Sequence, residues 1–258
     1  MNHIYQHFRG EEHHFIDQVV EWKENVLMQY SPKLTDFLDP REQEIVSSVI
    51  GENAEVKVSF LGGVHETERK RALLYPDYFE PSQEDFHLSL FEVQYASKFI
   101  TLSHRQVLGS LMSLGLKRSK FGDIRFYQDS VQIICADEIS DYLNMNFNEV
   151  GRSKINLKQK SLNELIPHED EIQELITTVS SLRLDVVGAA IYNISRQKIQ
   201  PLITNELVKV NWKVVDSTSF ECQEGDTISI RGYGRSKLAS IEGKTKKDRF
   251  RIIVEKQK

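Results

Sequence analysis

Long apolar runs and paired cysteines are both missing from this chain of 258 residues. No stretch reaches the roughly 18 apolar residues that a membrane-spanning helix needs. The first residues, MNHIYQHFRGEEHHF, contain no apolar core of a signal peptide. Cys135 and Cys222 lie far apart and neither belongs to a CxxC motif, which argues against a zinc ribbon or a disulfide framework. We therefore expect two inert, buried thiols in a cytoplasmic protein without a membrane partner.

Motifs for cofactor and metal chemistry are also scarce. The segment FLGGV is too short for a nucleotide-binding glycine fingerprint, and RGYGRSK lacks the GK[ST] ending of a phosphate loop. We interpret the latter segment as a β-turn with basic flanks. Of the four histidines near the start, His3 and His7 have the spacing of one helix face, but no third ligand is evident beside them. We expect no metal, no cofactor and no small-molecule substrate.

Charge is distributed unevenly along the chain. The net charge is −5. Residues 1–180 carry 18 basic and 29 acidic residues, a balance of −11, whereas residues 181–258 carry 15 basic and 9 acidic residues, a balance of +6. Within the acidic part, residues 98–125 hold six cations and one anion. An acidic body with two basic regions favours a polyanion as partner.

Residues 1–80 are predicted to form an N-terminal α+β domain. Apolar residues at steps of three and four predict a helix over 11–30. The segment LDPREQEIVSSVIG predicts a second helix, bounded by an N-cap, a first-turn proline, a capping-box glutamate and a final glycine, namely Asp39, Pro40, Glu42 and Gly51. EVKVSFLGG alternates as a strand, and TERKRALLYP is predicted as a short basic helix that Pro76 closes.

Residues 81–160 are predicted to follow a strand–helix–strand–strand–helix–strand order, which is typical of a ferredoxin-like or RRM-like fold. The expected elements are 88–95, 103–115, 123–128, 130–136, 137–147 and 154–159. Ser103 is a natural N-cap for the first helix. RNA-recognition motif proteins stack bases on exposed aromatic residues of two central strands. Here those strands offer only Phe91 and Tyr95, and their apolar neighbours favour burial, so we predict the fold without base stacking on the sheet.

Residues 161–180 are predicted as a helical linker with a solvated acidic face, followed by a domain over 181–258. The sequence of that last domain predicts two helices followed by several strands. Ser195 is expected to cap the second helix with its hydroxyl. Arg196 and Lys198 follow in the first turn, where the helix dipole disfavours positive charge. We interpret these two cations as ligands for an anion from outside the chain.

A series of fragments in the last domain has a recognisable order and spacing. They are Arg183-Leu184-Asp185, Ser195-Arg196, Ile203, Val208-Lys209-Val210-Asn211, Val214-Val215, Gly225-Asp226 and Arg231-Gly232. Together they resemble the ribosomal protein S4-like RNA-binding domain, in which two helices pack on a small sheet and basic residues bind structured RNA. The resemblance implies that Asp185 orients a neighbouring arginine and that RNA is bound by Arg183, Arg196 and Lys198, with Lys209, Lys213 and Arg231 as further candidates.

Two residues depart from the pattern of that family, and a third is unfavourable within a helix. The family usually has glycine at the positions of Glu206 and Trp212, so the Asn211-Trp212 turn must differ or hold a strained residue. Glu206 also brings negative charge close to the proposed surface. Pro201 removes a helical hydrogen bond and predicts that the second helix is kinked or short.

The whole chain resembles one family. FLDPREQEIV, FLGGVHETERKRALLYPDYF, LSHRQVLGSLMSLGLKRSKFGDI and the last domain occur in that order in the YlmH-type RNA-binding proteins of Gram-positive division gene clusters. The resemblance implies a ribosome-associated role in the rescue of large subunits that hold peptidyl-tRNA. Its implied partners are rRNA, the large ribosomal subunit and, as a further candidate, tRNA. Lys117, Arg118 and Lys120 are candidates for a second RNA contact, with a solvated helix C-terminus as the alternative.

S4-like domains also occur in RNA-modifying enzymes. A pseudouridine synthase needs a catalytic aspartate in its own domain, and the Arg-Leu-Asp at 183–185 belongs to the S4 resemblance. A methyltransferase needs a glycine-rich turn and a repeated βαβ order, and the sequence predicts neither. We therefore predict an α+β, multi-domain, non-catalytic RNA-binding factor. An RNA-modifying enzyme with an unrecognised site in residues 1–160 and a cell-division-linked adaptor are the alternatives.

Overall fold

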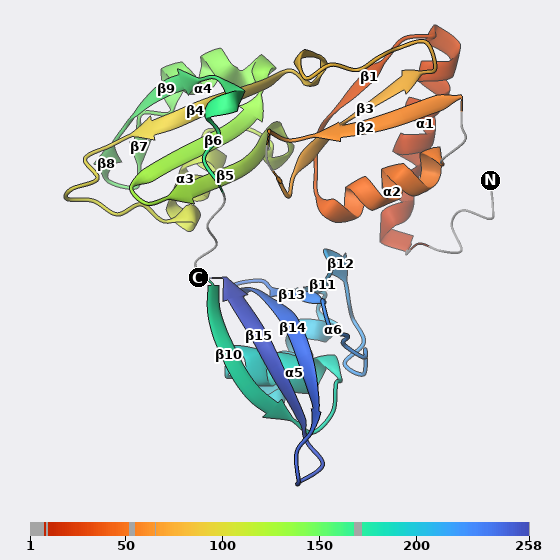
Figure 1. Cartoon of the computed structure of the whole chain (residues 1–258), viewed down its shortest axis with the longest axis vertical. Coiled ribbons are helices and arrows are strands. Elements are labelled where there is room, and N and C mark those ends of the chain that lie inside the picture. The colour runs from red at the N-terminus through yellow and green to blue at the C-terminus, as the bar shows by residue number, and fades with distance from the viewer. Residues whose placement is uncertain (1–7, 9, 52–54, 65, 168–171, 258) are drawn as a thin grey trace. The chain divides into compact units, whose positions relative to one another are not determined.

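The structure, a computed structural model, describes residues 8, 10–51, 55–64, 66–167 and 172–257. The chain divides into two compact units, Met1–Glu169 and Asp170–Lys258. Antiparallel sheets with packed helices build both units (Figure 1), so the predicted α+β class is confirmed. None of the helices in the described part of the chain is long and apolar enough to cross a bilayer.

The first unit begins with two helices packed on a three-stranded sheet. Its elements are the 3-10 turn η2 (Gly10–Glu12), α1 (His13–Gln29), β1 (Lys33–Leu38), α2 (Pro40–Ile50), β2 (Val56–Leu61) and β3 (Lys70–Pro76). The strand order is β1-β3-β2, and both pairings are antiparallel. The predicted capping box of α2 is confirmed: Asp39 accepts from the Glu42 amide, and the Glu42 side chain accepts from the Asp39 amide.

The segment predicted as a short basic helix is instead β3, the central strand of this sheet. It pairs with β1 on one side and β2 on the other, and every residue from Arg71 to Pro76 is buried. A short apolar run of this kind does not distinguish a buried helix from a strand that is covered on both faces. The helix prediction was therefore wrong, and Arg71, one of the cations of the predicted basic helix, lies in the interior.

The rest of the first unit is a four-stranded sheet with two helices. Its elements are η3 (Glu84–Phe86), β4 (Leu88–Gln94), α3 (His104–Ser113), η4 (Arg118–Lys120), β5 (Phe121–Tyr127), β6 (Ser130–Ala136), η5 (Asp137–Ile139), α4 (Ser140–Asn146), β7 (Glu149–Val150), β8 (Ser153–Lys154), β9 (Asn156–Lys160) and η6 (Leu162–Glu164). The strand order is β5-β6-β4-β9, and β7 pairs with β8 separately. Ser103 and Gln106 form a capping box at α3, which confirms the predicted N-cap.

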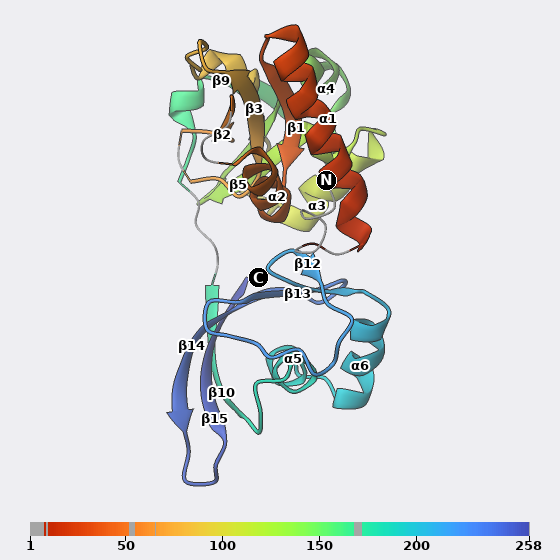
Figure 2. The same ribbon diagram turned by 90° about the vertical axis from the view of Figure 1, so that its right-hand side faces the viewer.

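The second unit is a six-stranded sheet with two helices on one face (Figure 2). Its elements are β10 (Ile172–Val179), α5 (Leu184–Tyr192), α6 (Arg196–Thr204), β11 (Val208–Val210), β12 (Lys213–Val214), β13 (Thr227–Ile230), β14 (Gly234–Lys244) and β15 (Phe250–Gln257). The strand order is β10-β15-β14-β13-β11-β12. Val187, Ile199 and Ile203 of the helices are buried together with Val208 and Val254 of the sheet.

The predicted helical linker is wrong for most of its described length. Residues 161–180 contain the short η6 turn and then β10, which pairs with β15 over eight positions. The β-branched run Ile176-Thr177-Thr178-Val179 suits a strand better than a helix. Because β10 joins the last domain, the sheet that was expected to be small has six strands.

Candidate nucleic-acid interface

Asp185, in the first turn of α5, is the centre of the predicted RNA-binding site. Its side chain is 0% exposed. It accepts hydrogen bonds from Arg183 Nε at 3.1 Å, Arg196 Nη2 at 2.5 Å and Gln200 Nε2 at 3.0 Å. Burial acts to raise the pKa of Asp185, but the hydrogen bonds from Arg183, Arg196 and Gln200 outweigh burial and lower the pKa to about 2. The carboxylate is therefore ionised at neutral pH and brings two arginines together, whereas the resemblance implied that it orients one.

Local structure explains how these groups converge. Arg183 occupies the N-cap position of α5, and the next two amides donate to the carbonyls of Phe220 and Thr218. On α6, Arg196 and Gln200 are four residues apart and so lie on one face of the helix. Gln200 was not predicted, although its spacing from Arg196 is a signal in the sequence that could have identified it.

The two guanidinium groups remain accessible after they pair with Asp185. The Arg183 side chain is 44% exposed and the Arg196 side chain is 53% exposed. Arg183 uses two of its five N–H donors on the carboxylate, and Arg196 uses one. Two cations on one anion leave a net positive charge, so Arg183 and Arg196 form a basic surface with donors for an external anion. We call this pair, with Asp185 and Gln200, the arginine cluster.

The other predicted residues lie elsewhere on the second unit. Lys198 is exposed on α6, but residues two apart on a helix do not share a face, so it points away from Arg196. Lys209 lies between the buried residues Val208 and Val210 and therefore projects from the sheet face opposite the helices. Lys213 is half-buried on β12, and Arg231 is exposed in the turn before β14.

The departures from the S4 pattern have a backbone explanation. Glu206 has a φ of 59°, Asn211 of 50° and Trp212 of 63°, all in the left-handed region that favours glycine. The turn after β11 therefore holds a strained residue, as expected, and the Arg235 guanidinium lies 5.2 Å from the centre of the Trp212 ring. Helix α6 contains Pro201 and ends at Thr204, so it is short.

Ser195 occupies the predicted N-cap position, but its hydroxyl makes no capping hydrogen bond. Its backbone carbonyl instead accepts from the amides of Lys198 and Ile199. The predicted position was right and the predicted hydroxyl contact was wrong, because the first turn of α6 is closed by the main chain.

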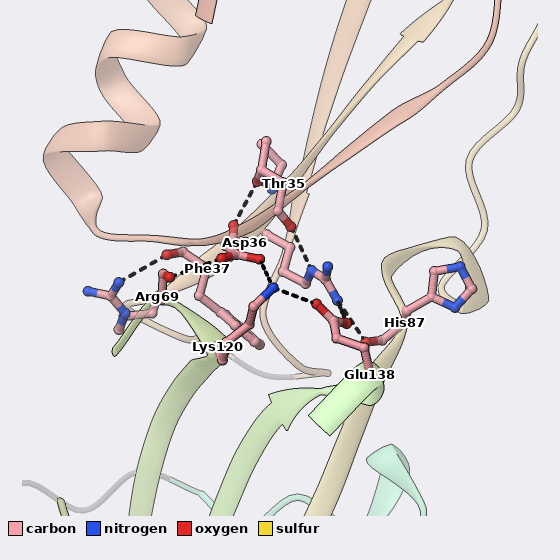
Figure 3. A network of polar contacts seen from close by, with 10 residues as sticks. Thr35, Asp36, Phe37, Arg69, His87, Lys120 and Glu138 are labelled. Carbon is pink, nitrogen blue, oxygen red and sulfur yellow. Dashed lines mark hydrogen bonds and ion pairs between the residues drawn. The ribbon is translucent and has the colours of Figure 1, made fainter. Parts of the chain in front are cut away.

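The candidate second RNA contact is mostly engaged within the first unit. Lys120 binds Asp36 at 2.5 Å and Glu138 at 2.9 Å (Figure 3). Arg118 donates to the carbonyls of Phe121 and Gly122, and burial lowers its pKa to about 10. Lys117 is exposed. The intramolecular contacts explain Arg118 and Lys120 without RNA, so this contact has much less support than the arginine cluster.

Both faces of the β5-β6-β4-β9 sheet are covered. On one face, Phe91 and Ile133 pack with Val107 of α3 and Leu143 of α4. On the other face, Leu90 and Ile134 pack against Phe37 of β1, Leu162 and Leu165. Phe91 is 2% exposed, which confirms its predicted burial, whereas Tyr95 is only half-buried and donates its hydroxyl hydrogen to the Asp129 carbonyl. Within the described residues, this sheet therefore presents no open aromatic face to RNA.

The remaining sequence candidates are explained more simply. His3 and His7 lie outside the described residues. Within the described part of the chain, no group of three His, Cys, Asp or Glu side chains could hold a metal ion. Cys135 and Cys222 are both free and buried, as predicted. Burial raises the pKa of the Cys222 thiol to about 12 and also raises the pKa of Cys135, which makes both thiols unreactive in the folded state.

Three domain families match the chain. Residues 11–79 match "YlmH, N-terminal", residues 81–164 match "Putative RNA-binding domain in YlmH" and residues 182–228 match "S4 domain". The chain is 52% identical over 260 residues to "Ribosome-associated protein quality control protein P2" from Bacillus subtilis (strain 168), with 100% of both chains covered. A solved structure, "Cell division protein ylmH from Streptococcus pneumoniae", is similar with a TM-score of 0.55 and 33% identity, covering 63% of this chain and 99% of that one.

Proposed function

The chain belongs to the YlmH family, and we propose that it is a cytoplasmic, non-catalytic RNA-binding factor that acts on ribosomal particles. The full-length similarity to a relative named as a ribosome-associated quality control protein supports this role. The proposed partners are structured rRNA of the large subunit and the tRNA of subunits that still hold peptidyl-tRNA. The observation that carries the proposal is the arginine cluster within the segment that matches the S4 domain.

The arginine cluster suits the RNA backbone for a physical reason. Guanidinium groups bind phosphate oxygens through parallel N–H donors in a planar fork. Asp185 holds both guanidiniums before RNA arrives, so less side-chain freedom is lost on binding. Phosphate contacts of this kind supply affinity without sequence preference, and selectivity for folded RNA then comes from shape.

We also infer that residues 81–160 have a ferredoxin-like arrangement. If β4, β5, β6 and β9 are counted as strands one to four, the sheet order β9-β4-β6-β5 reads 4-1-3-2, and α3 and α4 occupy the two crossover positions. The proposed domain boundary near residue 80 agrees with the family matches, which end at 79 and begin again at 81. The last domain is proposed to begin at β10 rather than at residue 181.

Binding of the full-length protein to purified large ribosomal subunits, measured across a salt titration, tests this function. Arg196→Ala should weaken binding and reduce the slope of log affinity against log salt by about one contact. Lys57→Ala, an exposed cation on β2, is the matched control and should bind like the wild-type protein. If Arg196→Ala and Lys57→Ala bind equally well, the arginine cluster does not contact RNA.

The same preparation distinguishes the alternatives. An RNA-modifying enzyme would leave a changed nucleoside in rRNA or tRNA after incubation, which mass spectrometry of digested RNA detects. A division-linked adaptor would retain its protein partner after nuclease treatment. The proposed role predicts unmodified RNA and a complex that nuclease destroys.

A further inference from the structure

The loop between β4 and α3 presents an aromatic side chain to solvent. Phe99 is 88% exposed, the highest value among the large apolar side chains that the structure describes. The loop forms a hydrogen-bonded turn: the Phe99 and Ile100 amides both donate to the Ala96 carbonyl, at 2.9 and 3.1 Å. Ile100 packs against the core, and Leu102 is 6% exposed. The backbone therefore anchors the residues around Phe99 and leaves its ring outside.

The sequence on either side of Phe99 carries basic residues and no acidic ones. Lys98 precedes Phe99, Arg105 follows in the first turn of α3, and both are exposed. The sequence has no acidic residue from 98 to 122. Two acidic residues, Glu92, which pairs with Lys160 at 3.7 Å, and Asp129, line a hollow beside the loop. A basic loop with an exposed aromatic ring suits RNA, because phosphates bind the cations and bases stack on the ring. An acidic protein surface offers negative charge but no bases to stack.

The position of the loop matters because the adjoining sheet has no open face. Phe37, Leu162 and Leu165 cover the face of the β5-β6-β4-β9 sheet that the helices leave uncovered. RNA contacts of this domain must therefore use its loops or helices. The β4–α3 loop, yellow in Figure 1, lies at the end of the domain away from α1 and α2, so these two helices do not cover it.

We propose that Phe99, Lys98 and Arg105 form a binding site for unpaired RNA nucleotides. A base stacks on the Phe99 ring, and the two cations bind the phosphates on either side. Every base has an aromatic face, so such a site accepts different sequences but excludes paired bases, whose faces are already stacked. The inference rests on the proposed function and adds a second RNA contact, in a different unit from the arginine cluster.

Fluorescence anisotropy with the full-length protein and two labelled RNAs tests the site: a short single strand of mixed sequence, and a duplex of equal length. Phe99→Ala should weaken binding of the single strand about fivefold or more and leave duplex binding unchanged. Phe99→Tyr keeps the ring and should bind like the wild-type protein. Lys98→Ala and Arg105→Ala should each lower the salt slope for the single strand by about 0.7.

Met145→Ala is the matched control, because Met145 is also highly exposed, at 77%, in the same domain. If Phe99→Ala and Met145→Ala both bind the single strand like the wild-type protein while Arg196→Ala weakens RNA binding, the loop site is wrong and the proposed function stands. If Phe99→Ala loses large subunits but keeps free single strands, the loop contacts protein and the inference is overturned. If the wild-type protein binds neither RNA nor large subunits, both the loop site and the proposed function are wrong.

Discussion

At the residue scale, Asp185 shows how one buried carboxylate can shape a basic surface. A carboxylate without exposure is costly unless every oxygen is hydrogen-bonded and the charge is paired. Arg183, Arg196 and Gln200 meet both conditions. The same contacts fix the direction of two arginines that are otherwise long and mobile. Stability and the proposed RNA contact are therefore linked through one side chain.

Asp185→Asn should lower the stability of the second unit and change its pH dependence. The folded-state pKa of Asp185 is lowered to about 2, so the stabilisation is fully present above the unfolded-state pKa near 4 and is lost as pH falls towards 2. Its size is on the order of 2 kcal/mol. Urea unfolding followed by Trp212 fluorescence, in a Trp22→Phe background, measures it because Trp22 and Trp212 are the two tryptophans of the chain.

The wild-type second unit should lose stability relative to Asp185→Asn as pH falls from 5 to 2. A parallel pH dependence of the two proteins would mean that Asp185 is not held as an ionised group in the folded state. Glu221→Gln, which changes an exposed carboxylate of the same unit, is the control and should follow the wild-type protein.

At the element scale, two connections in the second unit adopt conformations that their residues disfavour. Glu206, between α6 and β11, and Trp212, between β11 and β12, both have positive φ angles. Left-handed backbone costs a residue with a Cβ atom roughly 1 kcal/mol relative to glycine. The surrounding pairings maintain both turns: β11 pairs with β13, and the Leu207 amide donates to the Leu202 carbonyl. Tertiary contacts therefore override local preference here.

Glu206→Gly should stabilise the second unit, by up to about 1 kcal/mol, because it removes this strain and the greater freedom of glycine in the unfolded chain offsets only part of the gain. Trp212→Gly should gain less, since it also loses the contact between the ring and Arg235. Thermal unfolding of both variants provides the comparison. A destabilised Glu206→Gly variant would show that this side chain makes a stabilising contribution that exceeds the backbone strain.

At the scale of the whole molecule, polar contacts join the three-stranded and four-stranded sheet regions of the first unit. Arg71 of β3 is 4% exposed and donates to the carbonyls of Thr35 and His87 and to Glu138. Asp123 of β5 accepts from the backbone amides of Glu68 and Arg69. Lys120 links Asp36 to Glu138 (Figure 3). These contacts explain why residues 1–169 form one compact unit.

Each unit buries one cysteine, so thiol labelling can report the opening of each unit separately. Arg71→Ala leaves the Thr35 and His87 carbonyls without this buried donor and removes one of the two cations that bind Glu138, so it should cost about 3 kcal/mol in the first unit. It should therefore speed the labelling of Cys135 and leave that of Cys222 unchanged. Asp185→Asn should speed the labelling of Cys222 and leave that of Cys135 unchanged. Mass spectrometry after a pulse of iodoacetamide identifies which thiol has reacted.

Lys70→Ala, which changes the neighbouring half-buried cation, is the control for Arg71→Ala and should leave both labelling rates near the wild-type values. Equal acceleration of both thiols by either Arg71→Ala or Asp185→Asn would contradict independent opening and show that the two units unfold together.

Local signals in the sequence were sufficient for the α+β class and for α1, α2 and α3, with the capping box of α2 and the N-cap of α3, and the S4 resemblance implied the pairing of Asp185 with an arginine. These features depend on residues that are near one another along the chain, so spacing and side-chain chemistry determine them. The S4 resemblance likewise rests on short fragments in a regular order.

Only the tertiary structure decided the state of β3 and β10 and the roles of the basic residues. A buried apolar run becomes a helix or a strand according to the partners that cover it, and β3 and β10 have partners distant in sequence. In the same way, the sequence offers Lys120 and Arg118 as candidate cations for RNA. In the structure, Lys120 binds Asp36 and Glu138, and Arg118 donates to a carbonyl of β5. Charge is encoded locally, but its availability to RNA depends on which groups folding brings within hydrogen-bonding distance.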